Sequence, residues 1–278
     1  MIKRDVHIPL EAGFNQLARC RHGLMLFNRY DHYIGASLRK YGEWSENELT
    51  LFQQLVPDGS VVVEGGANVG AHTVALSKLV GNTGTVHAFE PQRLVFQTLC
   101  ANLALNGCIN VHAYHAALGA RTGEVLVPAL PPDRPANFGG VGLQNVSSGE
   151  RTPLRRIDEL DLHVCRLIKL DVEGMEAEAL QGAAQTVRRL RPLLYVENDR
   201  HHLHDVLIGL LHSWSYDAYW HIPPYFSKDN FAGDQENIFG QLASVNVACF
   251  PAELHVSVPG AKKIETCEAG ELRALQQP

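Results

Sequence analysis

The sequence predicts an α/β fold in which a mostly parallel sheet carries helices on both faces. Short apolar runs rich in valine, leucine and isoleucine alternate along the chain with segments of helical periodicity. Glycine, proline or asparagine stands at most of the junctions between them. Hydrophobic residues make up 45% of the 278 residues, which is enough to bury a large core. Such an alternation is typical of a parallel sheet, because parallel neighbours need a crossover connection.

The first half of the core holds three predicted strands and two predicted helices. A valine-rich run (SVVVE) predicts a buried strand, and a glycine-rich turn leads from it into a helix that ends near Gly81. Pro91 suits the start of the next helix, and Asn106-Gly107 suits its end. The elements expected here are strand 60–64, helix 70–80, strand 84–90 (GTVHAFE), helix 91–105 and strand 111–116.

The second half repeats this rhythm. The run at 166–171 (RLIKLD) predicts a strand, a helix follows to about residue 189, and the run at 193–197 (LLYVE) predicts the next strand. Two later runs, 216–221 and 244–250, predict further strands, joined by a segment rich in proline and aromatic residues. We therefore expect the sheet to continue beyond the second strand–helix–strand unit.

Two regions depart from the alternation. Residues 1–58 contain an amphipathic segment (GEWSENELTLFQQLV) and are expected to form an N-terminal cap. Residues 120–158 contain five prolines and the turn-like NFGGVGL, which predicts an insertion. No stretch has linker composition, so the chain is expected to be one domain over 1–278, with a core at 59–251 and a tail at 252–278.

Charge and composition exclude several classes of protein. The net charge of −6 provides no basic footprint, so nucleic acid is not an expected partner. No apolar run reaches the roughly 18–20 residues that span a bilayer, and the N-terminus has no secretory pattern. The six cysteines lack C-x-x-C pairing, which favours reduced thiols and a cytoplasmic location. The oligomeric state stays open.

The glycine-rich turn after the first strand (VVVEGGANVGAHTVA) predicts a ligand site. In a doubly wound sheet, ligands bind beyond the carboxyl ends of the strands, where the strand order reverses. Glu90 ends the second strand, 20 residues after Gly70. A carboxylate at this position accepts hydrogen bonds from both ribose hydroxyls of an adenosine. NAD enzymes and methyltransferases share this arrangement.

The turn itself favours one of these two classes. The dinucleotide-binding fingerprint requires glycine in the middle of the turn, where this chain has Ala67. The spacing fits G-x-N-x-G on Gly66, Asn68 and Gly70, because asparagine tolerates a left-handed conformation. Glu64, at the tip of the strand, suits an ammonium and repels a pyrophosphate. The turn thus favours a ligand with an amine and no phosphate. A larger side chain at Gly66 should fill the space where the turn meets the ligand. A plain tight connection is the alternative.

Four stretches, EGGANVGAHT, AFEPQ, IKLDVEGMEAEALQGA and RPLLYVEN, closely resemble the FkbM-type family of S-adenosylmethionine-dependent methyltransferases. The aromatic segment YWHIPPYF…NF…ENIF and the early DHYIGASLRKYGEW also resemble that family, so the resemblance covers roughly residues 28–251. It implies a Rossmann-like class I methyltransferase fold with a mostly parallel seven-stranded sheet whose last strand is antiparallel. It also implies S-adenosyl-L-methionine as the cofactor.

The resemblance assigns roles to particular positions. It implies that the glycine turn holds the methionine part of the cofactor, that Glu90 holds the ribose and that Ala116 and Ala117 lie near the adenine. Tyr41–Glu43 would close over the cofactor from the cap. Glu64 stands where the family more often has aspartate. The implied cofactor-binding residues are Tyr41, Glu43, Glu64, Gly66, Ala67, Asn68, Gly70, Thr73, Glu90, Pro91, Ala116, Ala117 and Asp171.

Acidic side chains at later strand ends are the candidate catalytic residues. Asp171 and Glu173 follow the fourth core strand, and Glu197 with Asn198 ends the fifth. The ends of parallel strands converge, so these groups are expected near the transferred methyl group, where a base or Lewis acid assists a hydroxyl acceptor. Asp171 with Glu197-Asn198 resembles the arrangement that holds magnesium in catechol-type O-methyltransferases, which allows Mg²⁺. Capping of neighbouring helices is the alternative.

Histidines follow the fifth strand. His201 and His204 in HHLH are expected on the surface of a helix, and His221 either lines an aromatic acceptor pocket or belongs to a structural crossover. Taken together, the sequence predicts a methyltransferase acting on a hydroxyl of a small molecule, such as a natural product or sugar. An NAD-dependent oxidoreductase and a non-catalytic adenosyl-binding module are the alternatives.

Overall fold

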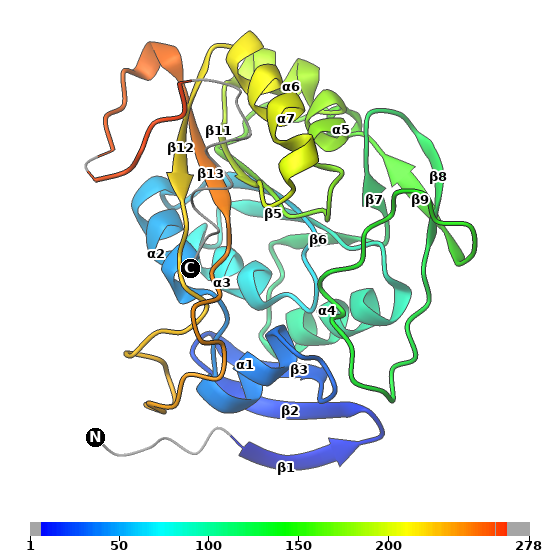
Figure 1. Cartoon of the computed structure of the whole chain (residues 1–278). Coiled ribbons are helices and arrows are strands. Elements are labelled where there is room, and N and C mark those ends of the chain that lie inside the picture. The colour runs from blue at the N-terminus through cyan, green and yellow to red at the C-terminus, as the bar shows by residue number, and fades with distance from the viewer. Residues whose placement is uncertain (1–6, 259, 266–278) are drawn as a thin grey trace.

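The centre of the molecule is a seven-stranded sheet (Figure 1). The computed structural model describes residues 7–258 and 260–265. All seven predicted core strands form. They are β4 (Val61–Gly65), β5 (Thr85–Phe89), β6 (Val111–Tyr114), β10 (Leu167–Leu170), β11 (Leu193–Glu197), β12 (Tyr216–His221) and β13 (Asn246–Pro251).

The strand order explains where a ligand can bind. Across the sheet the order is β12-β13-β11-β10-β4-β5-β6, and β13 runs antiparallel to both of its neighbours. The chain moves outward from β4 to β6 and then returns to β10 on the other side of β4. A crevice therefore opens between the carboxyl ends of β4 and β10, which is the topological switch point of a doubly wound sheet. This is the class I methyltransferase arrangement that the resemblance implied.

Helices cover both faces of the sheet. Neighbouring residues of one strand point to opposite faces, so Val63 packs with α5, α6 and α7, whereas Val62 packs with α2 and α3. These helices are α2 (Glu46–Leu55), α3 (Ala71–Leu79), α4 (Arg93–Leu105), α5 (Glu176–Gln181), α6 (Ala184–Leu190) and α7 (His201–Ser213).

Two predicted helices differ in detail from the structure. The helix expected up to residue 189 is divided into α5 and α6 at Gly182, where a Cβ would lie 2.1 Å from the carbonyl oxygen of Gly119. This close passage of two backbones leaves no room for a side chain at the junction. Pro91 lies two residues before α4 rather than at its start. The chain is extended through Pro91 and Gln92 instead. This conformation lets the N–H of Gln92 donate a hydrogen bond to the carboxylate of Glu90.

The N-terminal cap is more elaborate than the sequence predicted. The amphipathic segment does form α2, but a three-stranded antiparallel sheet precedes it (Figure 1, dark blue). Asn102 on α4 donates to the carbonyl of Leu26 and accepts from its N–H, which fixes this small sheet against the core. The additional elements are β1 (His7–Ala12), β2 (Asn15–Cys20), β3 (Gly23–Asn28) and α1 (Ile34–Tyr41).

The predicted insertion contributes two strands, β8 (Gly123–Val127) and β9 (Glu150–Arg155), to a second small sheet. Its third strand, β7 (Ala117–Leu118), lies just before the insertion, and the strand order is β7-β9-β8. Part of the predicted tail is ordered along β12, where Ile264 donates to the carbonyl of Ala218. The remainder of the tail, from residue 266, lies outside the described residues. Within the described chain, no helix combines the length and apolar character needed to cross a bilayer.

Candidate active site

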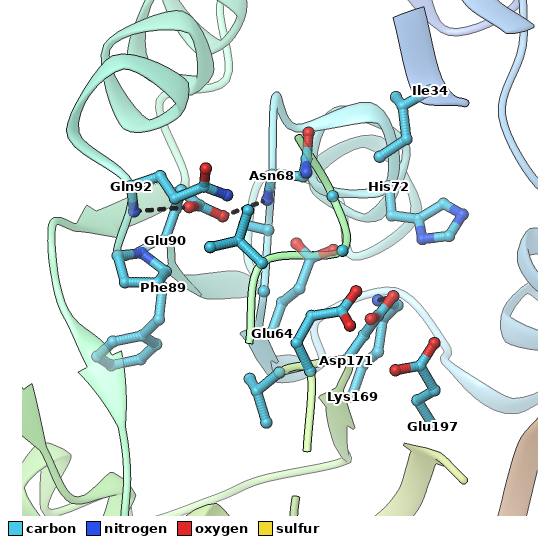
Figure 2. A pocket seen from close by; sticks show the side chains of 18 of the residues that line it. Ile34, Glu64, Asn68, His72, Phe89, Glu90, Gln92, Lys169, Asp171 and Glu197 are labelled. Atoms are coloured by element: carbon cyan, nitrogen blue, oxygen red, sulfur yellow. Dashed lines mark hydrogen bonds and ion pairs between the residues drawn. The ribbon is translucent and has the colours of Figure 1, made fainter. Parts of the chain in front are cut away.

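A cavity of about 380 Å³ opens at the carboxyl ends of β4, β5, β10 and β11 (Figure 2). This volume lies within the range of small-molecule sites, about 300–1,000 Å³. The strands meet there because they are parallel, so groups far apart in the sequence become neighbours. The expected cofactor and catalytic residues that line the cavity are Glu64, Gly66, Ala67, Asn68, Glu90, Pro91, Ala116, Ala117, Asp171, Glu173 and Glu197.

The glycine turn has the backbone that its spacing predicted. Gly66, Asn68 and Gly70 all have positive φ, at 75°, 50° and 87°, so the asparagine does take the left-handed conformation. The reason for glycine at position 66 differs from our expectation. A Cβ there would lie 1.8 Å from the backbone carbonyl oxygen of Asp171, and so would meet the end of β10 before any ligand. Gly66 is required by the close approach of two strand ends.

Glu90 is buried, with 3% of its surface exposed, and its carboxylate is held by the backbone. The N–H of Asn68 donates to Oε2 at 3.0 Å and the N–H of Gln92 donates to Oε1 at 2.8 Å (Figure 2). Each oxygen keeps acceptor capacity after these bonds. Burial raises the pKa of Glu90 to about 7, although the two N–H bonds act in the opposite direction. The group is therefore fixed in place and able to accept further donors from the cavity.

Glu64 is the second buried carboxylate of this end of the cavity. Its exposed fraction is 1%, and the Thr73 hydroxyl donates to Oε2 at 2.6 Å. Burial raises the pKa of Glu64 to about 7, against the opposing effects of Lys169 and Thr73. Thr73 and Gly70, both expected to bind the cofactor, do not line the cavity. They lie behind the turn, where Thr73 supports Glu64 and Gly70 passes close to Leu99.

Three carboxylates converge at the other end. Asp171, Glu173 and Glu197 each offer an oxygen atom, and these atoms all lie within 4.8 Å of one another. Glu173 has a left-handed backbone, with φ at 56°, and its carboxylate accepts a hydrogen bond from Arg200. Burial, with Asp171 next to it, raises the pKa of Glu173 to about 8 and that of Glu197 well above its ordinary value. Like charges this close are unfavourable unless protons or a cation separate them.

Comparison with known proteins decides the family. A model of the methyltransferase FkbM domain matches residues 64–218, which is more than half of the chain. The chain belongs to the FkbM methyltransferase family. A search of curated proteins finds no significant match. The FkbM match includes the turn, both buried carboxylates and all three converging acids.

Solved structures with a similar fold include several methyltransferases. A methyltransferase FkbM from Methylobacillus flagellatus KT is 18% identical, covers 69% of this chain and has a TM-score of 0.47. The chain spans only 44% of that protein. The precorrin-6y C5,15-methyltransferase from Geobacter metallireducens GS-15 is 15% identical, with 73% of this chain and 86% of that one covered and a TM-score of 0.46. Aeropyrum pernix fibrillarin, solved with natively bound S-adenosyl-L-methionine, is 11% identical, with coverages of 88% and 97% and a TM-score of 0.43.

Two residues that the FkbM resemblance placed at the cofactor do not line the cavity. The Tyr41 hydroxyl donates to the carbonyl of Glu236 and accepts from the N–H of Ile238. Glu43 accepts hydrogen bonds from Arg21 and from the N–H of Phe231. Both side chains therefore tie the cap to the segment between β12 and β13. The cap does reach the cavity, but through Tyr33, Ile34, Trp44 and Glu48.

The Asn198 and histidine expectations also need correction. Nδ2 of Asn198 forms a hydrogen bond of 2.8 Å with Nδ1 of His204, and Asn198 does not line the cavity, where Glu173 instead joins Asp171 and Glu197. His204 is fully buried and stacks on Trp220, whereas we expected it at the surface. His221 does not line the cavity and its Nδ1 pairs with the Tyr195 hydroxyl at 2.8 Å. The geometry therefore favours the alternative in which His221 belongs to a structural crossover.

Sequence reasoning missed Lys169, which lies at the centre of this FkbM site (Figure 2). It is 2% exposed, and its Nζ lies 3.6 Å from Oδ2 of Asp171. Burial alone would lower the pKa of Lys169, but four carboxylates outweigh it and raise the pKa. A lone lysine inside an apolar strand (RLIKLD) was the available signal, because a buried charge needs partners.

His72 is the second lining residue that was missed. It lies on the first turn of α3, is 6% exposed, and its buried Nε2 has no hydrogen-bond partner. Burial, followed by the nearby charge of Lys169, lowers its pKa to about 3, so the imidazole is neutral. A neutral ring with an unused nitrogen on the wall of the cavity can bond to a ligand.

Proposed function

We propose that this chain transfers a methyl group from S-adenosyl-L-methionine to a hydroxyl of a small molecule, such as a natural product or sugar. One observation carries the proposal. Two buried carboxylates, Glu64 and Glu90, flank a left-handed turn at the switch point of the sheet, and they open onto the same cavity as Asp171. Membership of the FkbM methyltransferase family supports the same reaction class.

The residues of one end of the cavity fit this cofactor. We call this the cofactor end, and it consists of Glu64, the turn 65–70 and Glu90 with its neighbours. Glu90 retains acceptor capacity for ribose hydroxyls, and Glu64 places a carboxylate where an ammonium would lie. The Ala116 and Ala117 positions leave room beside Glu90 for an adenine. The carboxylate of Glu64 would repel a pyrophosphate, which disfavours NAD.

The other end suits the acceptor. We call it the acceptor end, and it comprises Asp171, Glu173, Glu197 and Glu48 together with the rings of Trp44 and Tyr225. When bound, the cofactor supplies an electrophilic methyl group, whose C–S bond breaks, leaving its electron pair on sulfur, as the C–O bond to the acceptor forms. In this proposal Asp171 accepts the hydroxyl proton, and Lys169, 3.6 Å away, keeps its carboxylate in place. The site chiefly positions the reactants.

The expected partners follow from the same lining. Acidic groups surround the acceptor end, so a polyanionic nucleic acid would be repelled, whereas a small neutral or cationic molecule is admitted. We also propose a cytoplasmic location without a membrane partner, because the cysteines lack C-x-x-C pairing and no apolar run is long enough to span a bilayer.

Two measurements test the proposed function. Calorimetry should show binding of S-adenosyl-L-methionine and S-adenosylhomocysteine, and no binding of NAD. Release of S-adenosylhomocysteine is then followed over a panel of hydroxylated natural products and sugars. Binding of NAD alone would support the oxidoreductase alternative. Tight cofactor binding without turnover of any acceptor would support the non-catalytic module.

A further inference from the structure

The cavity is lined by far more acidic than basic side chains. Among the described residues that line the cavity, the acids are Glu48, Glu64, Glu90, Asp171, Glu173, Glu197 and Asp199, and the bases are Lys169 and Arg200. Arg200 is engaged by Glu173, and an ion pair of 3.8 Å joins it to Asp199. Lys169 is shared among four carboxylates, so it neutralises none of them fully.

Most of these acids have donors of their own, but one oxygen of Glu197, Oε2, does not. Glu64 and Glu90 accept hydrogen bonds from Thr73 and from the turn, as described above, and Glu48 accepts one from the Ser45 hydroxyl at 2.8 Å. Oε2 of Glu197 is buried and has no hydrogen-bond partner. A buried carboxylate oxygen without a donor is costly, because it has lost its water. A donor with a positive charge would supply what the site lacks.

Aromatic rings accompany these acids. Trp44 and Tyr225 line the same end of the cavity, with ring centroids 4.9 Å apart. Burial raises the pKa of Tyr225, and the charge of Glu197 adds to the effect, followed by those of Asp171 and Glu48. The ring of Tyr225 therefore lies within the electrostatic field of these three carboxylates. Aromatic faces next to acids bind organic cations, whereas Mg²⁺ retains waters and gains nothing from a ring.

We propose that the methyl acceptor carries a protonated amino group, which Glu197 and the rings of Trp44 and Tyr225 hold while a nearby hydroxyl is methylated. This inference rests on the proposed methyl transfer and names its substrate class, a hydroxylated amine such as an amino sugar or amino cyclitol. The ammonium remains protonated, so its nitrogen has no lone pair with which to compete for the methyl group. Binding energy at the amine positions the hydroxyl next to Asp171.

The first experiment compares matched ligands on the complex with S-adenosylhomocysteine, in the presence of EDTA. The probes are glucosamine and its neutral partners glucose and N-acetylglucosamine, titrated by nuclear magnetic resonance. We expect glucosamine to bind at least tenfold more tightly than either neutral sugar. Equal binding of all three, or binding of none, would overturn the inference. In a parallel titration without EDTA, displacement of glucosamine by Mg²⁺, together with a requirement for Mg²⁺ in turnover, would also overturn it, because the carboxylates would then hold a metal.

Variants locate the amine. Glu197→Gln keeps the shape but removes the charge, and should weaken glucosamine binding at least tenfold while S-adenosylhomocysteine binds within twofold of wild type. Trp44→Leu should weaken glucosamine by about threefold to tenfold and leave glucose unchanged. Glu124→Gln, at an exposed acid of β8, is the matched control and should change neither affinity. Unchanged glucosamine binding in Glu197→Gln would refute the assignment.

Turnover separates this inference from the proposed function. Acceptor panels of amino sugars and amino cyclitols are assayed beside the same compounds N-acetylated. Methylation of the free amines with at least tenfold higher kcat/KM supports the inference. Methylation of the neutral compounds at equal or higher kcat/KM would overturn the inference and leave the proposed function intact. Failure to bind S-adenosyl-L-methionine at all would instead overturn the proposed function.

Discussion

The two ends of the cavity hold their carboxylates in different ways. At the cofactor end, Glu90 accepts two backbone N–H groups and Glu64 accepts the Thr73 hydroxyl. At the acceptor end, Asp171, Glu173 and Glu197 lie within 4.8 Å of one another, and Oε2 of Glu197 has no donor. The first end is preorganised by the backbone of the turn, whereas the second leaves a buried carboxylate oxygen without a donor.

The difference has a cause in the chain. Residues of the cofactor end lie within one strand–turn–helix unit and its neighbour, so local backbone geometry fixes them. At the acceptor end, two acids follow β10, Glu197 ends β11 and Glu48 lies on α2, so only tertiary packing brings them together. Substitutions at the two ends should therefore fail differently, and the following predictions are ordered by the size of the expected effect.

The largest effect is expected at Gly66, where the two ends meet. In Gly66→Val, the added Cβ would lie 1.8 Å from the carbonyl oxygen of Asp171, so the turn and the end of β10 must separate. We expect cofactor binding to fall below detection by calorimetry and the acceptor end to be distorted as well. Gly209→Ala on α7 is the control, because a Cβ there meets nothing within 4 Å and the residue does not line the cavity. Wild-type affinity in Gly66→Val would show that the turn does not shape the site.

The next effect is confined to the acceptor end. Asp171→Asn is nearly isosteric but cannot take a proton, so it should keep the fold and the cofactor affinity while kcat falls. A general base contributes about 10²–10⁴-fold, and the loss should lie in that range. Single-turnover kinetics with a working acceptor measure it. Wild-type turnover, with chemistry rate-limiting, would assign Asp171 a structural role and direct attention to Glu197.

The same assay decides between proton transfer and a metal ion. EDTA should leave wild-type turnover unchanged if Asp171 acts as a base. A reversible loss that Mg²⁺ restores would show that the converging carboxylates hold a cation.

A smaller effect is expected at the cofactor end. Glu90→Ala would remove the two charge-assisted contacts that we propose to the ribose, and one such bond is worth about 1.5–3 kcal/mol, so affinity should fall at least tenfold. The variant also leaves the N–H groups of Asn68 and Gln92 without their partner. Thermal denaturation must therefore accompany the titration. Glu150→Ala, at an exposed acid paired with Arg93, is the matched control. Unchanged affinity in a folded Glu90→Ala would refute the ribose assignment.

The same contrast explains what the sequence could predict. The seven core strands, the left-handed Asn68 and the position of Glu90 follow from short-range patterns, so all of them were foreseen. Asp171 and Glu197 were foreseen because parallel strand ends converge. Lys169 and His72 were missed because a sequence does not show which polar residues are buried together.

We also missed elements whose buried face is not the more apolar one. β2 buries Gln16, Ala18 and Cys20 and leaves Leu17 partly exposed, so its periodicity gave no sign of a strand with an apolar face. His204 was placed at the surface because nothing local shows that α7 turns this face toward Trp220. Tyr41 and Glu43 were expected at the cofactor by resemblance alone, and their bonds to the segment between β12 and β13 depend on the tertiary fold.

The smallest effect concerns the pH dependence of stability of the ligand-free protein. The pKa values of Glu64 and Glu90 are raised from 4.5 to about 7, so the folded chain keeps protons that the unfolded chain has lost. Stability from these groups is complete below 4.5 and is lost as pH rises through about 7. His72 acts in the opposite direction, because its pKa is lowered from 6.5 to about 3, so its contribution is lost as pH falls below 6.5. The two effects oppose each other between pH 4.5 and 6.5, and only the carboxylates act above it.

We therefore expect the Tm of the ligand-free protein to decline from pH 6.5 to 8, as measured by scanning calorimetry. Glu90→Gln cannot ionise, so its decline over this window should be shallower than that of wild type. Glu150→Gln is the control, because the pKa of the exposed Glu150 is lowered by Arg93 and the group is already charged throughout the window. A Tm that rises with pH, or equal slopes in wild type and Glu90→Gln, would contradict a buried, proton-retaining carboxylate at the cofactor end. The two ends of the cavity would then differ in the hydrogen bonds of their carboxylates, and not in proton retention by Glu90.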